Sequence, residues 1–418
     1  MNTEPVRQKD EPLANSPKLG LVKGFRDFSG EEAVKRAEIM RIIADTFEKY
    51  GFEPAETPII EQEEFVRGEN SSDEAVSDIF KLQDKGKRNL ALRYEFTFQL
   101  KRLMQNKKLP YKRYQIGPVF RDEPISANRF RQFTQCDMDT IGSTIKDDAE
   151  ILAASNEIMN KVGIESVILV NNRSLLNEIL NDNKIKEKDK EQVLREIDKY
   201  DKIGEKEVRA NLKKFGAEKV VDCLQKGEKY FSKFESYKEI LELIKYCKLY
   251  GIKILFSPTL IRGLSYYNKN VFEVKSKDIT GNKEISSNSP KLGQIKETLI
   301  AGGSYMFNNV QCVGVAFGLD RIAMLAKINL DKEKILIISL EKDKETIELA
   351  EKLRKSGKIV SIYYGKPSRA LDYANSYGFQ KAVFVGEKEL KAKKFMIKDM
   401  KTGKEKSLDF SEKPSIGF

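Results

Sequence analysis

Two strand-like runs joined by a long charged connection, between Tyr114 and Gly142, constrain the fold of this chain most strongly. In the first run, which ends at Arg121, every second residue is apolar, as in a strand with one buried face. Arg121 lies opposite that apolar side. In the second run one face carries an aromatic ring, an amide and two acids, namely Phe133, Gln135, Asp137 and Asp139. We therefore predict an antiparallel pair of strands with an ordered polar face.

The connection between the runs, residues 122–132, is longer than the roughly two to five residues of most hairpins. It carries Glu123, Arg129 and Arg131. A guanidinium group can hold two phosphate oxygens at once, and a neighbouring aromatic ring can stack on a base. We interpret the segment as part of a nucleotide-binding pocket. A surface loop held by salt bridges is the alternative.

Four segments resemble motifs of class II aminoacyl-tRNA synthetases, and of histidyl-tRNA synthetases in particular. The hairpin resembles motif 2. LRYEFTFQLKR at 92–102 resembles the amino-acid-binding turn, and LIRGLSYYNKNVFEV at 260–274 resembles the histidyl signature. GVAFGLDRIAML at 314–325 resembles motif 3. A single match would be weak, but four in the family's order form a specific pattern.

The resemblance implies an α+β fold. We expect a flexible tail at 1–20 and, at 21–328, a class II synthetase-like catalytic domain built on an antiparallel sheet. Residues 174–250 are rich in Lys and Glu and lack strong strand runs, which predicts a helical insertion. In the family this insertion lies near the acceptor arm of the tRNA, but a solvated charged face would also explain its lysines.

Strand and helix patterns alternate from residue 334 to residue 390, which predicts a compact α/β domain at 329–418. This domain resembles the anticodon-binding domain of histidyl-tRNA synthetases; a stand-alone RNA-binding domain is the alternative.

Near the N-terminus, Ser29 and Glu32 form a capping-box pattern ahead of an amphipathic helix that runs to Gly51. The following GFEPAETPIIE resembles motif 1, through which the family forms homodimers, although packing of the helix on its own sheet would explain the pattern equally.

Composition narrows the possible chemistry. The 418 residues have a formal net charge of +11, which favours a polyanionic partner such as RNA, although general lysine enrichment is the alternative. Four dispersed cysteines argue against a disulfide framework or zinc ribbon and fit a reducing cytoplasm. The polar N-terminal stretch does not resemble a signal peptide, and no run reaches membrane-spanning length. The chain has no histidine, which excludes imidazole acid–base catalysis and His-ligated metals.

The resemblance assigns an ATP site and the catalytic residues. Arg121 and Arg262 would contact the α-phosphate and act in catalysis, and Arg321 would bind the γ-phosphate. Glu123 would contact the adenine edge, and Phe133 would stack under the base. Mg²⁺ would be carried on the phosphates, and we assign no protein side chain to it.

The resemblance also assigns a histidine site. A carboxylate and two neutral acceptors, from Glu95, Thr97 and Gln135, would receive the α-ammonium group. Asp139 and Tyr267 would hydrogen-bond the imidazole nitrogens. Tyr266 and Phe96 would line the pocket.

Several positions depart from the family pattern and put amino-acid affinity in question. They are Tyr94 and Phe96 around Glu95, Ser265 after Gly-Leu, and Ser304, Met306 and Phe307 in place of an Arg-Tyr-Asp-Gly-like run. On a regular strand Arg262 and Tyr267 would face opposite ways, so we expect a bend or bulge near Gly263. The small residues of AGGSYMF at 301–307 would let the backbone approach the ligand.

The expected function is that of a cytoplasmic, homodimeric histidine–tRNA ligase that uses L-histidine, ATP and histidine tRNA. The alternative is a non-catalytic paralogue that senses histidine or binds RNA as a regulatory subunit.

Overall fold

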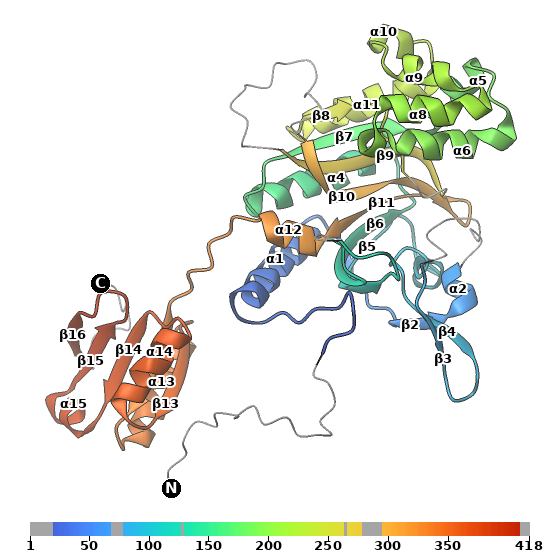
Figure 1. Ribbon diagram of the computed structural model, residues 1–418. Coiled ribbons are helices and arrows are strands. Elements are labelled where there is room, and N and C mark those ends of the chain that lie inside the picture. The colour runs from blue at the N-terminus through green and yellow to red at the C-terminus, as the bar shows by residue number, and fades with distance from the viewer. Residues whose placement is uncertain (1–19, 68–77, 127–128, 263–265, 278–294, 410–418) are drawn as a thin grey trace. The chain divides into compact units, whose positions relative to one another are not determined.

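The computed structural model describes residues 20–67, 78–126, 129–262, 266–277 and 295–409. The chain divides into two compact units, Met1–Ile328 and Asn329–Phe418 (Figure 1). Each unit is built on its own sheet.

An eight-stranded sheet forms the centre of the larger unit, in the order β1-β5-β6-β11-β10-β9-β7-β8. The outer pairs β1–β5 and β7–β8 are parallel, and all the pairs between them are antiparallel. This confirms the predicted α+β class. The bounds are β1 Glu53–Pro54, β5 Tyr111–Phe120, β6 Gln132–Ile141, β7 Ser166–Asn172, β8 Ile254–Phe256, β9 Tyr267–Lys277, β10 Ile295–Phe307 and β11 Val310–Gly318.

The predicted hairpin is the β5–β6 pair. Its apolar residues Tyr114, Cys136 and Met138 belong to the main hydrophobic core. The expectation of a strand buried on only one face is wrong for β5, because Arg113 and Gln115 on its other face are also buried. The reason is that other segments cover this second face: Arg113 donates to the Phe96 carbonyl and Gln115 to the Thr57 hydroxyl.

Helices pack against the sheet to close the main core. They are α1 Gly30–Lys49, α4 Ile145–Lys161, α11 Glu235–Leu249 and α12 Leu319–Leu325. On α1, Phe47 packs its ring 5.5 Å from Tyr114 of β5 and 5.4 Å from Phe317 of β11. Aromatic contacts of this kind fix the position of α1 on the sheet.

The capping box predicted at the start of α1 does not form. Ser29 is the residue that precedes the helix, but its side chain makes no capping hydrogen bond. Glu32 instead pairs with Arg26 at 2.7 Å. A capping box does form at α4, between Thr144 and Asp147.

The predicted helical insertion is present, and residues 173–249, which the structure describes throughout, contain no strand. Its residues Leu176, Ile179 and Leu194 share the main core with Val170 and Phe272 of the sheet. The insertion is therefore packed on the sheet as part of the same unit. Its helices before α11 are α5 Arg173–Asp182, α6 Glu187–Asp198, α7 Tyr200–Ile203, α8 Glu205–Leu212, the short 3-10 turn Lys213–Phe215, α9 Glu218–Leu224 and α10 Glu228–Phe231.

A smaller three-stranded sheet, in the order β2-β4-β3, lies in the same unit. Two exposed apolar side chains on it, Ile60 and Leu82, lie opposite Leu92 and Leu90 of the central strand. Its elements and the short helices that neighbour it in sequence are β2 Ile60–Gln62, α2 Glu63–Arg67, β3 Lys81–Gln83, β4 Asn89–Leu92 and α3 Leu100–Leu103.

The C-terminal unit has a five-stranded sheet in the order β13-β12-β14-β15-β16. The first three strands pair in parallel, and alternate residues of β12 join two separate cores, one with α13 and one with α14. The predicted alternation of strands and helices is confirmed, but the antiparallel strands β15 and β16 were not anticipated. The bounds are β12 Lys334–Ser339, α13 Asp343–Lys355, β13 Ile359–Tyr364, α14 Pro367–Ser376, β14 Lys381–Val385, α15 Glu387–Ala392, β15 Lys394–Asp399 and β16 Glu405–Asp409.

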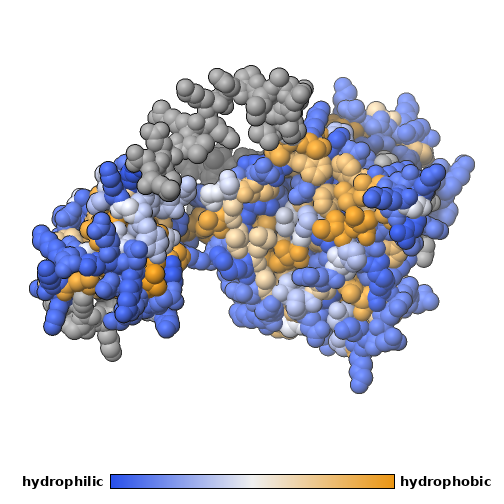
Figure 2. All heavy atoms as spheres, turned by 90° about the horizontal axis from the view of Figure 1, so that it is seen from below, coloured by the Kyte–Doolittle hydropathy of each residue, from blue (hydrophilic) through white to orange (hydrophobic). Residues whose placement is uncertain are grey.

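Hydrophilic residues cover most of each unit on the face shown in Figure 2, with scattered apolar patches on the larger one. Within the described ranges, every helix is too short or too polar to cross a bilayer.

Candidate active site

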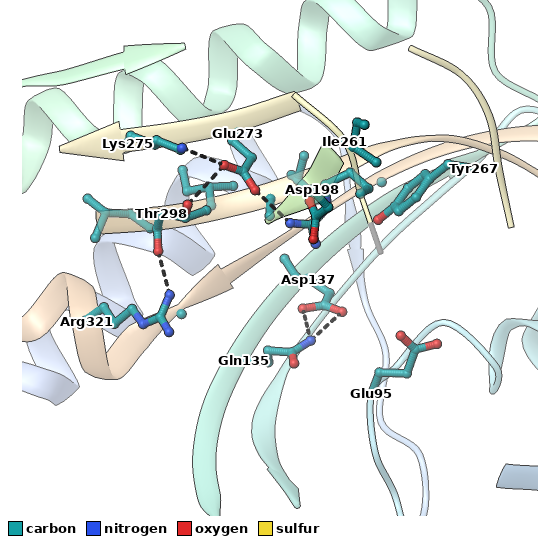
Figure 3. A pocket seen from close by; sticks show the side chains of 18 of the residues that line it. Glu95, Gln135, Asp137, Asp198, Ile261, Tyr267, Glu273, Lys275, Thr298 and Arg321 are labelled. Carbon is teal, nitrogen blue, oxygen red and sulfur yellow. Dashed lines mark hydrogen bonds and ion pairs between the residues drawn. The ribbon is translucent and has the colours of Figure 1, made fainter. Parts of the chain in front are cut away.

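A cavity of about 800 Å³ opens on the polar face of the β5–β6 hairpin. Its walls come from β6, β9, β10 and β11, from the turn before α3, and from the start of α12 (Figure 3). The predicted polar face is confirmed, because Phe133, Gln135, Asp137 and Asp139 all border it. Segments more than two hundred residues apart in sequence therefore meet around one space.

The cavity brings together nearly all the residues singled out from the sequence. Three arginines, Arg121, Arg262 and Arg321, border the same space. Phe96 does not border it: the ring is fully buried and lies 4.8 Å from the Arg93 guanidinium. The other residues predicted for the site that line the cavity are Glu95, Thr97, Glu123, Phe133, Gln135, Asp139, Tyr266 and Tyr267.

Arg121 lies between two aromatic rings. Its guanidinium carbon is 4.2 Å from the centre of the Tyr94 ring and 5.0 Å from that of Phe133. The same side chain donates to Gln135 Oε1 at 3.2 Å. Tyr94, one of the departures from the family pattern, thus provides a flat surface that restricts the orientation of this cation.

The charged connection between β5 and β6 also forms the salt bridges expected of a surface loop, which was the alternative to a nucleotide-binding segment. Arg129 pairs with Glu123 at 3.2 Å, and Arg131 pairs with Asp122 at 3.0 Å. Glu123 and Arg129 nevertheless border the cavity. The loop is therefore both salt-bridged and part of the cavity wall.

Arg262 pairs with Glu273 in a compact ionic group, in which Figure 3 labels Glu273, Lys275 and Thr298. Its NH1 donates to Glu273 Oε1 at 2.9 Å, while Glu273 Oε2 accepts from Thr298 at 3.0 Å and pairs with Lys275 at 3.4 Å. Burial opposes the charge of Arg262, but the neighbouring Tyr267 and Glu273 raise its pKa above the usual value, so it stays cationic. Arg262 precedes β9, which begins at Tyr267, and the bend expected near Gly263 falls outside the described residues.

Arg321 lies in the first turn of α12, where its NH1 donates to the Thr298 carbonyl at 2.9 Å. The preceding residue, Asp320, accepts from Arg36 of α1 at 2.9 Å and from the Thr134 backbone at 2.9 Å. This buried bridge joins α12 to α1 and to β6, which fixes where Arg321 enters the cavity.

Glu95 is the most isolated acid of the site. Its Oε1 is buried and has no hydrogen-bond partner within the described part of the chain. Burial raises the pKa of this carboxyl to about 8, and the nearby Arg121 charge only partly offsets the effect. A buried acceptor without a partner is costly unless a ligand supplies a donor, so Glu95 is suited to a cationic group.

Asp139 is held at both oxygens. Oδ2 lies 2.8 Å from the Arg113 guanidinium, and Oδ1 accepts from the Tyr305 hydroxyl at 2.6 Å. The Tyr305 ring is centred 5.6 Å from that of Tyr266, which directly precedes β9, and the Tyr266 ring is 4.7 Å from that of Tyr267, the first residue of β9. Burial raises the pKa of all three phenols, so they remain neutral hydrogen-bonding groups.

Sequence comparison agrees with this geometry. The family profile described as "Histidyl-tRNA synthetase" matches residues 24–322, and that described as "Anticodon binding domain" matches residues 334–416. The chain belongs to the histidyl-tRNA synthetase family.

Relatives of this histidyl-tRNA synthetase family member match along nearly the whole chain. "Histidine--tRNA ligase 1" of Bacillus cereus is 33% identical, with 93% of this chain and 95% of the relative covered. "Histidine--tRNA ligase" of Methanocaldococcus jannaschii is 34% identical, with 93% and 97% covered. The crystal structure of histidyl-tRNA synthetase from Nostoc sp. PCC 7120 superimposes with a TM-score of 0.79 at 22% identity, covering 94% of this chain and 98% of that one. The last comparison establishes the shared fold.

The glycines of AGGSYMF allow close packing within the sheet. A Cβ on Gly302 would lie 2.1 Å from the Gly314 carbonyl, and one on Gly303 would lie 2.6 Å from the Asn270 carbonyl. These glycines therefore permit close packing against neighbouring strands. Ala301 of the same segment borders the cavity, and the expected approach of the backbone to a ligand stays a prediction. The next residue, Ser304, donates to buried Asp148 at 2.9 Å, which accounts for this departure from the family pattern.

Sequence reasoning missed several residues of this synthetase site. Asp137 was placed on the polar face but given no role. Arg113 and Tyr305 were not singled out, although the two-residue period of the hairpin could have placed Arg113 on the polar face. The insertion was also missed as a wall of the cavity, to which it contributes Asp198 and Tyr200. No local pattern signals that contact.

We expect Gly314→Ala to disrupt the part of the cavity around Asp139, to which the resemblance assigns the histidine side chain. A Cβ at this position would lie 2.0 Å from Asp139 Oδ1, closer than any real contact, so the carboxylate would have to move away from Tyr305. We predict a loss of histidine affinity of at least about tenfold, with the affinity for ATP changed much less. Titration of each substrate by calorimetry would check this. Gly318→Ala is a matched control, since its nearest atom would be 3.8 Å away; equal effects of the two substitutions would contradict the prediction.

Proposed function

We propose that this protein activates L-histidine with ATP to give histidyl-adenylate and pyrophosphate, and then transfers the histidyl group to the terminal ribose of histidine tRNA. The observation that carries the proposal is the meeting of Arg121, Arg262 and Arg321 with a buried acidic group in one cavity. Guanidinium groups match the triphosphate, and the acids match an amino acid that carries a cationic ammonium group.

In the first step an oxygen of the histidine carboxylate attacks the α-phosphorus of ATP, and the bond to the β-phosphate oxygen breaks. The attacking group is already an anion, so no base has to remove a proton, which suits a chain without histidine. Arg121 and Arg262 offset the charge that develops on the α-phosphate, and Arg321 holds the departing pyrophosphate. Arg121 and Arg262 each retain a buried Nε that lacks a partner among the described residues and could donate to phosphate.

Glu123 would contact the adenine edge and Phe133 would stack on the base. Because Arg121 now lies against the Phe133 ring, ATP binding would require the guanidinium to turn toward the phosphates. Glu95, Thr97 and Gln135 would receive the α-ammonium group, and Asp139 and Tyr267 would hydrogen-bond the imidazole. Gln135 already bridges Arg121 and Asp137, so it couples the ATP and histidine halves.

Mg²⁺ would enter on the phosphates of ATP. Within the described ranges no group of three or more His, Cys, Asp or Glu side chains could hold a metal ion alone. Mg²⁺ commonly keeps several waters and binds through substrate phosphates, so ATP itself would carry the ion into the cavity. The ion would neutralise phosphate charge.

We also propose a cytoplasmic homodimer. The exposed apolar side chains Ile59 and Ile60, within the segment that resembles motif 1, support a subunit contact. The four free cysteines are buried, as suits a reducing compartment. The C-terminal unit, with its match to the anticodon-binding profile, would hold the tRNA.

Histidine-dependent exchange of labelled pyrophosphate into ATP tests the first step, and charging of purified histidine tRNA tests the second. We expect exchange with histidine and none with phenylalanine, which lacks the imidazole nitrogens. A folded protein that binds histidine but supports no exchange would favour the regulatory paralogue instead.

A further inference from the structure

Arg113 is a fully buried cation with no role in the mechanism above. It lies in β5 directly opposite Asp139 of β6, and its NH2 contacts Asp139 Oδ2 at 2.8 Å and the Phe96 carbonyl at 3.0 Å. Burying a guanidinium is expensive, and a paired carboxylate offsets that cost only when the geometry is good. Arg113 and Asp139 therefore form one structural unit at the floor of the histidine site.

The hydrogen bonding of Arg113 is incomplete. Its Nε and NH1 are buried and have no partner among the residues that the structure describes. An arginine retained only for stability would usually have these donors satisfied. The remaining donor of Arg113, NH2, does have partners. One of them is the carboxylate of Asp139, which Tyr305 of β10 also holds.

The charge balance around Asp139 depends on Arg113. Burial raises the pKa of Asp139, and Arg113 is the strongest opposing influence, followed by the Tyr305 hydroxyl. Burial raises the pKa of Asp137 to about 7. Asp137 and Glu95 are further acids in this region, and the negative charge of each opposes ionisation of the neighbouring acids. The titratable and charged groups facing Asp139 are Arg113 from β5, Asp137 from its own strand, Tyr305 from β10, Cys312 from β11 and Glu95 from the turn before α3.

We propose that Arg113 is a positioning residue for histidine recognition: it keeps the Asp139 carboxylate ionised and oriented, so that this carboxylate accepts a hydrogen bond from the imidazole N–H. The inference rests on the proposed function, in which Asp139 contacts the imidazole. Arg113 itself does not border the cavity, so it acts through Asp139. A protonated Asp139 would present a donor at one oxygen, and the preference for an N–H group would be weakened.

The test compares Arg113→Met with the parent protein in histidine-dependent pyrophosphate exchange. We expect the KM for histidine to rise roughly 10- to 30-fold at about pH 7, with the KM for ATP within about threefold. As the pH rises above neutrality, the variant-to-parent ratio of histidine KM should fall, because Asp139 regains its charge. Taking the ratio cancels the ionisation of histidine itself. Arg113→Lys should restore part of the affinity.

Two further variants locate the effect. In an Asp139→Asn background residue 139 cannot titrate. The histidine KM of the double variant Arg113→Met, Asp139→Asn, divided by that of Asp139→Asn alone, should therefore not change with pH. Arg93→Met is the matched control, since Arg93 is also buried but its guanidinium donates to the backbone carbonyls of Thr57 and Pro118. It should not produce a pH-dependent ratio.

A flat ratio in Arg113→Met, or a pH-dependent ratio that persists in the Asp139→Asn background, would overturn the inference. If Arg113→Met does not fold, Tyr305→Phe is the alternative variant, because it removes the second partner of Asp139 at almost constant side-chain size. Its variant-to-parent ratio of histidine KM should also fall as the pH rises, by a smaller amount. Failure of the proposed function is a distinct result, because the parent protein would then show no histidine-dependent exchange.

Discussion

Replacing Arg262 by alanine is expected to slow histidyl-adenylate formation by about a thousandfold while weakening histidine binding by less than about tenfold. Arg262 stays cationic in the cavity, and its proposed target is charge that develops on the α-phosphate only as the carboxylate attacks. Loss of an interaction that forms mainly in the transition state lowers the rate without an equal loss of substrate affinity. Single-turnover adenylate formation and equilibrium titration of histidine measure the two quantities separately.

Two controls accompany Arg262→Ala. Glu273→Gln leaves the guanidinium in place but removes the charge of its ion-pair partner, so a much smaller rate loss is expected. Arg262→Lys keeps the charge but lacks the forked donors and should recover only part of the rate. Equal losses of rate and of histidine affinity in Arg262→Ala would contradict the assigned role.

The second large effect is expected for Glu95→Gln, which should weaken histidine binding by about 100-fold. Glu95 has a buried oxygen without a partner in the described structure, and burial raises its pKa to about 8. At about pH 7 the carboxyl is therefore mostly protonated before the ligand arrives. An α-ammonium group favours the ionised form, so binding should release a proton.

Calorimetry in buffers of different ionisation enthalpy measures this proton release directly. We expect the release to be clear near pH 7 and to shrink well above the pKa of about 8, where Glu95 is already ionised. Glu95→Gln should reduce it. Asp137, which is also buried and has a pKa of about 7, is the control for the origin of the proton, and a release unchanged in Glu95→Gln but lost in Asp137→Asn would reassign it.

Local sequence patterns predicted the structure correctly where a feature depends on a single strand or hairpin. The two-residue period between Tyr114 and Gly142 correctly placed Phe133, Gln135, Asp137 and Asp139 on one face. The failures have local causes too. Ser29 makes no capping hydrogen bond and Glu32 pairs with Arg26. The glycines at 302 and 303 accommodate neighbouring backbone, which no count of small residues can reveal.

The sequence by itself determined the family, the antiparallel hairpin and the identity of the charged groups, because these depend on residue types at short, regular spacings. Only the tertiary structure decided which of those groups meet. The pairing of Arg113 with Asp139 depends on strand register, that of Asp139 with Tyr305 on the order β6-β11-β10, and that of Arg36 with Asp320 on the packing of α1 against α12. Contacts between distant segments are fixed by burial of the whole core, so local spacing does not encode them.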